Sequence, residues 1–226
     1  MCGRFQLSVK GKTISERFNV AVFDEKYKPS YNCAPGQYLP VITNEKPNLL
    51  QWFFWGFTPA WAANRADIKP QINSRSESLE TKASFKQAVQ QRRCLIPASG
   101  FYEWQTKGPK QPFHIFLKNN PVFVFAGIWE SYQTVEGEWL NSFCIITKAA
   151  TEHMSAIHHR MPVILAQNNE NDWLLADSEE KRQQLVESIS DDDLGFMPVS
   201  TRVNDVRNND ETLLKPWKFP EQQSLF

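Results

Sequence analysis

The sequence has no long run of apolar residues and no net charge. Its 226 residues include 25 basic and 25 acidic side chains, and no stretch approaches the roughly 20 apolar residues of a membrane span. No apolar segment follows the N-terminus as it would in a secretion signal. We therefore expect a cytoplasmic protein. Because 41% of the residues are hydrophobic, one substantial core can form, and a single domain over residues 1–226 is expected.

Cysteine and histidine are scarce and widely spaced. Structural zinc usually draws on closely spaced ligand pairs, and no cysteine pairs with a histidine in that way here. A His-Glu-x-x-His helix is also absent, so we expect no metal and no cofactor. Scattered cysteines in a reducing compartment argue against disulfides, and two of them, Cys94 and Cys144, lie in apolar runs typical of a core. The residues concerned are Cys2, Cys33, Cys94, Cys144, His114, His153, His158 and His159.

The neutral total hides an uneven distribution of charge. Residues 170–193 contain nine acids and two bases, which leaves 23 bases and 16 acids in the rest of the chain. A basic face opposite an acidic helical segment would suit a polyanionic partner. Solvated charge is the simpler explanation of either cluster, and the two interpretations stay open at this point.

Alternating and β-branched apolar runs indicate mostly strands with short connections. The pattern lacks the strand–helix alternation of a parallel sheet, so we expect an α+β fold with antiparallel sheets in a barrel-like core and helices outside. Turn residues at 107–109 and 136–138 indicate hairpins. Strands are predicted at 39–43, 49–57, 94–97, 101–105, 112–117, 122–129, 143–147, 162–166 and 196–200, and helices at 14–20, 84–91, 151–156, 172–175 and 179–189.

Cys2 is the residue with the most distinctive chemistry. Removal of Met1, which a small second residue permits, would leave a free α-amine beside the thiol. Their pKa values lie near ~8 and ~8.5, so both groups are partly nucleophilic at neutral pH. A 1,2-aminothiol condenses with an aldehyde and closes to a thiazolidine. The alternative is that Cys2 is an arbitrary second residue.

Polar islands with a fixed order support the chemical interpretation. The islands are Met1-Cys2-Gly3-Arg4, Tyr31-Asn32-Cys33-Ala34-Pro35-Gly36, Trp55-Gly56-Phe57-Thr58-Pro59, Asn73-Ser74-Arg75-Ser76-Glu77, Gly100-Phe101-Tyr102-Glu103-Trp104, Ile157-His158-His159-Arg160-Met161-Pro162 and Pro198-Val199-Ser200. In these motifs and their order the chain resembles the SRAP (SOS response-associated peptidase) family, which shields abasic sites in single-stranded DNA by covalent attachment through an N-terminal cysteine. The loop after residue 57 departs slightly, because a single Trp61 stands where some members have two tryptophans.

The resemblance implies four catalytic residues. Cys2 would form the thiazolidine crosslink, and Glu103, between two aromatic residues, would move the proton that opens the abasic sugar. His158 would transfer protons during capture, reversal or β-elimination, a lyase-type reaction; the motif register favours it over the adjacent His159. Asn73 would hold the ring oxygen or the linkage. For Glu103, His158 and Asn73 the alternative is an ordinary structural side chain.

The resemblance also implies contacts with single-stranded DNA and an association with the nucleoid when DNA is bound. Arginines would clamp phosphates, aromatic residues and a proline would stack on or wedge between bases, and two polar side chains would bond the backbone. For any one aromatic side chain, core packing is the alternative. The predicted DNA-binding residues are Arg4, Asn32, Pro35, Trp61, Arg75, Trp104, Thr147 and Arg160.

Two other functions fit parts of the same pattern. Cys2 and His158 could form an N-terminal nucleophile arrangement of a thiol peptidase, for example an autopeptidase that removes Met1. Alternatively, the arginines and aromatic residues would suffice for a non-covalent reader of single-stranded or modified DNA.

Overall fold

The structure, a computed structural model, describes residues 2–21, 26–63, 65, 67–186 and 191–217. The strands are β1 (Phe5–Leu7), β2 (Ser30–Cys33), β3 (Tyr38–Thr43), β4 (Gln51–Trp55), β5 (Asn73–Arg75), β6 (Arg93–Ala98), β7 (Gly100–Trp104), β8 (Pro112–Leu117), β9 (Phe123–Gln133), β10 (Trp139–Ala149), β11 (Arg160–Pro162) and β12 (Leu194–Pro198). The α-helices are α1 (Gly11–Phe18), α2 (Ala83–Gln91), α3 (Glu152–Ser155), α4 (Glu170–Leu175) and α5 (Glu179–Leu185). Short 3-10 helices include η1 (Ala60–Ala62), η2 (Ser76–Ser78), η5 (Thr201–Asn204) and η6 (Glu211–Leu214).

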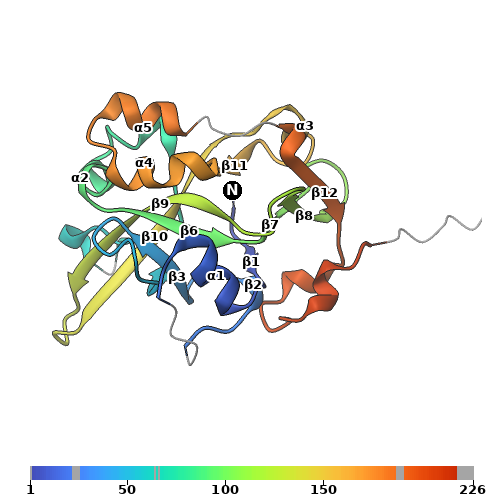
Figure 1. The fold of residues 1–226 in the computed structure, drawn as a ribbon, viewed down its shortest axis with the longest axis horizontal. Helices are drawn as coiled ribbons and strands as arrows, with labels where there is room; N and C mark the ends of the chain where they lie inside the picture. Colours follow the sequence, from blue (N-terminus) through green and yellow to red (C-terminus); the bar gives the residue numbers. More distant parts are fainter. Residues whose placement is uncertain (1, 22–25, 64, 66, 187–190, 218–226) are drawn as a thin grey trace, which may run out of the picture.

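Five strands close into a small barrel at the centre of the molecule. Their order is β10-β4-β3-β6-β9, and β9 pairs again with β10 to complete the ring. Strands β5 and β11 extend the barrel along β10. Helices α2, α4 and α5 gather at one end of the barrel, and α1 lies near β2 and β3 (Figure 1). This arrangement confirms the α+β fold with a barrel-like core and peripheral helices.

A second sheet with the order β12-β8-β7-β1-β2 packs against the barrel. One core cluster joins the two, because it contains Phe5 of β1 and Phe101 of β7 together with Phe125 of β9 and Phe143 of β10. A second cluster lies between the barrel and the helices, where Phe85 and Trp173 are almost fully buried. Cys94 and Cys144 are fully buried free thiols, as predicted for core residues.

Most predicted elements are confirmed, and both predicted hairpins form. The turn between β9 and β10 contains Gly137 at φ 83°, and that between β7 and β8 contains Gly108 at φ 75°. These backbone angles favour glycine, because a Cβ is strained there. Within the part of the chain that the structure describes, no helix is long and apolar enough to cross a membrane.

Several details of the prediction are wrong. The strand predicted at 162–166 is wrong in its bounds, because β11 comprises Arg160–Pro162. The apolar residues after it leave β10 and form hydrogen bonds with β9, where Leu165 N donates to the Val124 carbonyl. Helix 14–20 begins earlier and ends before Asn19, which adopts a left-handed conformation at φ 51°. The sheets are not wholly antiparallel, since β10 pairs in parallel with β4 and β5.

Three short strands, β1, β2 and β5, were not predicted. Each has only three or four residues, so polar positions within them hide any alternation. Helix α5 ends earlier than predicted, and residues 187–189 of that prediction lie outside the described residues.

Candidate active site

The pairing of β1 with β7 brings Cys2 next to Glu103. Phe5 lies opposite Phe101, and Tyr102 N donates a hydrogen bond to the Arg4 carbonyl over 2.9 Å. Side chains alternate along a strand: Phe101 faces the core between the sheets, whereas Tyr102 packs in a cluster with Val203 and Leu213. Residue 103 therefore points to the same side as Phe101, where Cys2 also packs.

Burial changes the acidity of both groups. Cys2 is fully buried and Glu103 is 3% exposed. Burial raises the pKa of Glu103 to about 7, since the charged form loses hydration. Burial, followed by the negative charge of Glu103, raises the pKa of the Cys2 thiol well above its usual range. Glu103 can therefore exchange a proton near neutral pH, while the thiol is held in its neutral form.

Asn73 anchors the backbone of Cys2. Its amide Nδ2 donates a hydrogen bond to the Cys2 carbonyl over 2.8 Å. Asn73 begins β5, whose parallel register with β10 places it opposite Ile145. Its Oδ1 is buried and has no hydrogen-bond partner among the described residues, and a buried acceptor of this kind is costly unless something occupies it. Cys2, Asn73 and Glu103 thus meet at one place.

His158 is half-buried and precedes β11. Its Nδ1 lies 3.0 Å from the backbone nitrogen of Arg160 and 3.1 Å from the carbonyl oxygen of the same residue. Either tautomer is therefore hydrogen-bonded at Nδ1, so Nε2 can gain or lose a proton without rotation of the ring. Burial lowers the pKa of His158. The exposed His159 stacks on it, with 4.4 Å between ring centroids.

Strands β5, β10 and β11 lie side by side and carry three predicted DNA-binding residues. Thr147 pairs with Arg75 on one side and Pro162 on the other. Arg160 is buried and donates to Glu77 in a bidentate ion pair, at 2.5 and 3.0 Å, and also to the Thr147 carbonyl. Thr147 itself is fully buried, and its hydroxyl donates to the Ser74 carbonyl.

The C-terminal segment, residues 201–214, accepts hydrogen bonds from Arg4, Asn32 and Trp104. Arg4 donates to Asn32 Oδ1 over 2.8 Å and to the Val203 carbonyl over 2.6 Å. Asn32 is 1% exposed, and its amide donates to the carbonyls of residues 203, 205 and 208. Trp104 Nε1 donates to Asn204 Oδ1 over 2.8 Å. These side chains therefore hold the segment in place through internal hydrogen bonds.

The remaining predicted DNA-binding residues are solvent-facing. Trp61 is 57% exposed on η1, and Pro35 is exposed in the turn between β2 and β3. Arg75 is exposed, and its guanidinium makes no hydrogen bond or ion pair with the described residues. Of the three predicted phosphate-binding arginines, Arg75 is the one whose guanidinium makes no contact of this kind, whereas those of Arg4 and Arg160 already bind internal acceptors.

Two contributors to this region had no predicted role. Glu77 lies in the motif that contains Asn73, and its acidic charge beside basic residues is the one signal that could have indicated its pairing with Arg160. The segment Thr201–Asn204 showed no signal, because one backbone carbonyl, that of Val203, makes its contacts with Arg4 and Asn32.

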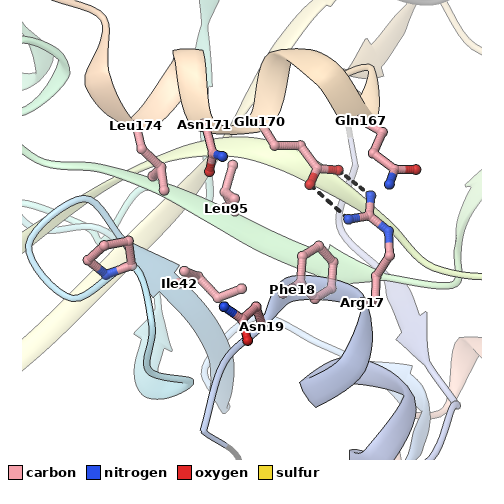
Figure 2. Close-up of a pocket in the computed structure, with 10 residues that line it drawn as sticks. Arg17, Phe18, Asn19, Ile42, Leu95, Gln167, Glu170, Asn171 and Leu174 are labelled. Atoms are coloured by element: carbon pink, nitrogen blue, oxygen red, sulfur yellow. Dashed lines mark hydrogen bonds and ion pairs between the residues drawn. The ribbon is translucent and has the colours of Figure 1, made fainter.

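No group of three or more His, Cys, Asp or Glu side chains suited to a metal occurs among the described residues. A separate cavity of about 280 Å³ lies near α1 and α4 and contains none of the predicted site residues. Figure 2 shows Arg17 and Glu170 joined across it by two hydrogen bonds, at 2.6 and 3.1 Å. The charges of Arg17 and Glu170 therefore compensate each other.

Comparison with known proteins gives a consistent result. The family model described as SOS response associated peptidase (SRAP) matches residues 1–206. Abasic site processing protein YoqW of Bacillus subtilis (strain 168) is 40% identical over 95% of this chain and 99% of its own length. Abasic site processing protein HMCES of Gallus gallus is 32% identical over 84% of this chain and 67% of its own length. A crystal structure of a protein from Bacteroides thetaiotaomicron is 25% identical, with a TM-score of 0.88 over 96% of this chain and all of the other.

Proposed function

Because this chain belongs to the SRAP family, we propose that it processes abasic sites in single-stranded DNA by joining the freed N-terminus of Cys2 covalently to the deoxyribose. The names of its relatives support the choice of lesion. The observation that carries the mechanism is the meeting of Cys2 with Asn73 and the buried Glu103. The proposal requires removal of Met1, since the peptide bond otherwise blocks the Cys2 amine.

Opening of the sugar is the first step. An abasic deoxyribose is mainly a closed hemiacetal, and its ring oxygen must gain a proton as the C1 hydroxyl loses one. A carboxyl group whose pKa is about 7 is present in both protonation states near neutral pH, so Glu103 can donate one proton and accept the other. The Asn73 amide lies next to Cys2 and can orient the sugar oxygen.

Capture then proceeds through the amine. The Cys2 nitrogen attacks the aldehyde carbon, and the carbinolamine loses water to give an imine. The thiol sulfur adds to the imine carbon while its proton reaches the nitrogen, which closes the thiazolidine with a net loss of one water. We assign the amine to the first attack because burial keeps the thiol neutral.

His158 is the second proton carrier in this proposal. Its Nε2 can protonate the departing hydroxyl of the carbinolamine, because Nδ1 keeps a hydrogen bond to Arg160 in both tautomers. The same group could assist reversal of the crosslink or strand cleavage by β-elimination.

The DNA strand would be held by residues around this centre. Arg75 is the first candidate for a phosphate contact because its donors are unengaged, and Trp61 offers an exposed aromatic face. Residues that already make internal contacts would bind DNA only through remaining donors or after exchange of a partner. We assign the contacts to Arg4, Asn32, Pro35, Trp61, Arg75, Trp104, Thr147 and Arg160.

A thiol peptidase is less well supported by the same geometry. Such an enzyme needs a thiolate activated by a neighbouring base, whereas burial and the charge of Glu103 raise the pKa of the Cys2 thiol.

The test is incubation of the processed protein with single-stranded DNA containing one abasic site, followed by a denaturing gel. Wild type should give a heat-stable shifted band, and Cys2→Ala should not. Cys2→Ser retains the amine, so it should give a labile adduct that only borohydride reduction preserves. An equal band from Cys2→Ala would refute the assignment.

Cys33→Ala is the matched control, because Cys33 is also a buried free thiol but lies within β2 and has no free amine. It should form the same heat-stable band as wild type. A peptidase would instead cleave a peptide in a Cys2-dependent manner, and a non-covalent reader would shift DNA in native gels alone.

A further inference from the structure

A groove between β2 and β3 combines an aromatic surface with positive charge. It has a volume of about 340 Å³, which falls within the range of small-ligand sites. Lys26 and Lys28 are exposed at its rim, and the described residues that line it include no acidic side chain. Trp52 and Tyr38 contribute its aromatic surface.

Tyr38 has the properties of a stacking platform. It is 58% exposed, although it lies on a strand of the barrel and lines the groove. Its ring packs edge-on against Phe54, with 5.7 Å between centroids at 64°. An exposed ring held in this way loses little conformational freedom when a flat partner stacks on it.

Two amide side chains offer hydrogen-bond donors to the groove. The oxygen of Gln37 accepts from the backbone nitrogen of Ala34 over 2.9 Å, and the oxygen of Asn209 accepts from that of Tyr31 over 2.6 Å. Both amide groups are therefore oriented through their oxygens. Their NH₂ groups make no hydrogen bond with any described residue, so they remain available to phosphate or base oxygens.

The groove borders the turn that holds Pro35, because Cys33 and Gln37, on either side of that turn, both line it. Pro35, assigned above to a DNA contact, occupies the turn that connects β2 to β3, and Gln37 follows it by two residues and lines the groove. A DNA strand that contacts Pro35 is therefore close enough to extend into the groove. Lysines, a fixed aromatic ring and oriented amide donors are the features that hold single-stranded nucleic acid without reading its sequence.

We propose that this groove is a subsite for a nucleotide of the flanking strand that lies beyond the one adjacent to the abasic site, with its base stacked on Tyr38 and its phosphate near Lys26 and Lys28. This inference rests on the proposed function and extends the DNA footprint beyond the residues assigned above. It places part of the DNA affinity away from the reacting sugar, so the length of the flanking strand should affect binding.

The test uses single-stranded oligonucleotides that contain a tetrahydrofuran analogue of the abasic site, which cannot form the crosslink. One has a single flanking nucleotide on each side and the other has eight. Tyr38→Ala should bind the long oligonucleotide roughly tenfold more weakly than wild type, as expected for the loss of one stacked base. The short oligonucleotide should bind equally to both proteins. Equal affinity of both proteins for the long oligonucleotide would overturn the subsite.

Three variants make the result specific. Tyr38→Phe retains the ring and should restore the affinity, whereas Trp139→Ala removes another exposed aromatic residue, on β10, and should leave the affinity unchanged. The double variant Lys26→Gln and Lys28→Gln should reduce the salt dependence of long-strand binding, since about two fewer phosphates are neutralised. An unchanged salt slope would overturn the phosphate contact, and binding of a peptide or a free nucleoside in place of the strand would overturn the choice of occupant.

The analogue separates this inference from the covalent function. Failure of wild type to crosslink an aldehydic abasic oligonucleotide would count against the function of Cys2, while the affinities for the analogue would still decide whether the groove binds the flanking strand.

Discussion

Replacement of Glu103 by glutamine should stabilise the protein at neutral and alkaline pH and have little effect in acid. The carboxyl group has a pKa of about 7 when folded, because it is buried, against 4.5 in its ordinary state. Below pH 4.5 it is protonated in both folded and unfolded chains. Between pH 4.5 and 7 only the folded chain holds the proton, so the free energy of unfolding of wild type falls as pH rises. Above pH 7 the carboxyl group is ionised in both states, and the folded state bears the full cost of burying its charge.

The size of the effect follows from the difference in pKa. Each unit corresponds to about 1.4 kcal/mol, so Glu103→Gln should exceed wild type by about 3 kcal/mol in the free energy of unfolding at pH 8. The assay is urea unfolding of both proteins at intervals from pH 4 to 8. Glu138→Gln, which removes an exposed carboxylate from the β9–β10 turn, is the control and should follow wild type throughout.

A constant difference between Glu103→Gln and wild type across this range would refute the reasoning, because it would mean that burial does not perturb the carboxyl group. The same variant should slow crosslinking by a factor of roughly 10²–10⁴, as expected for the loss of a general acid–base group. A stabilised but slow enzyme is the combined signature of a group retained for function at a cost in stability.

Four further substitutions test other parts of the structure. Arg93→Met should lower the free energy of unfolding by about 4 kcal/mol or more, because the buried guanidinium donates to four backbone carbonyls that would lose their partner; urea unfolding measures it. Gly100→Ala should be strongly destabilising, since a Cβ would lie 2.2 Å from His114 Nε2, whereas Gly137→Ala meets open space and should cost only about 1 kcal/mol of backbone strain; thermal unfolding compares them. Asn32→Ala removes the amide group that donates to the carbonyls of residues 203, 205 and 208 and should accelerate amide hydrogen exchange in residues 201–214.

Each of these has an outcome that would contradict it. Arg65→Met removes an arginine whose partner, Asp67, is exposed, and should change stability by less than ~1 kcal/mol; equal effects at residues 65 and 93 would deny the role of the buried carbonyls. Similar losses from the two glycine variants would exclude the steric contact with His114. Unchanged exchange in Asn32→Ala would show that the C-terminal segment is held by other contacts.

The sequence predicted the long elements of this fold because their periodicity spans enough residues to be read. Strand β8 matches its prediction residue for residue, and α2 differs by one residue at its start. The parallel pairing of β10 with β5 depends on contacts between residues about 70 positions apart, which no local pattern records. The prediction placed β11 too late in the chain, because the apolar run continues past Pro162 although the backbone hydrogen bonds there pass from β10 to β9.

The candidate site was predicted from the order of its motifs, and the structure shows how three of its members meet. Contact between Asn73 and Cys2 could not be read from spacing, since it depends on how β5 extends the barrel beside the second sheet. The contacts of Arg4 and Asn32 with Val203 were also invisible, because a backbone carbonyl has no sequence signature. Such partners emerge only when distant segments pack together.

Mass spectrometry of the N-terminal peptide of the protein–DNA adduct tests the central claim most directly. A thiazolidine predicts a peptide that starts at Cys2, carries the deoxyribose with the loss of one water, and resists alkylation of its thiol. An adduct on another residue, or an adduct whose Cys2 thiol is still alkylated by iodoacetamide, would contradict the capture of the abasic sugar by the amine and thiol of Cys2 together.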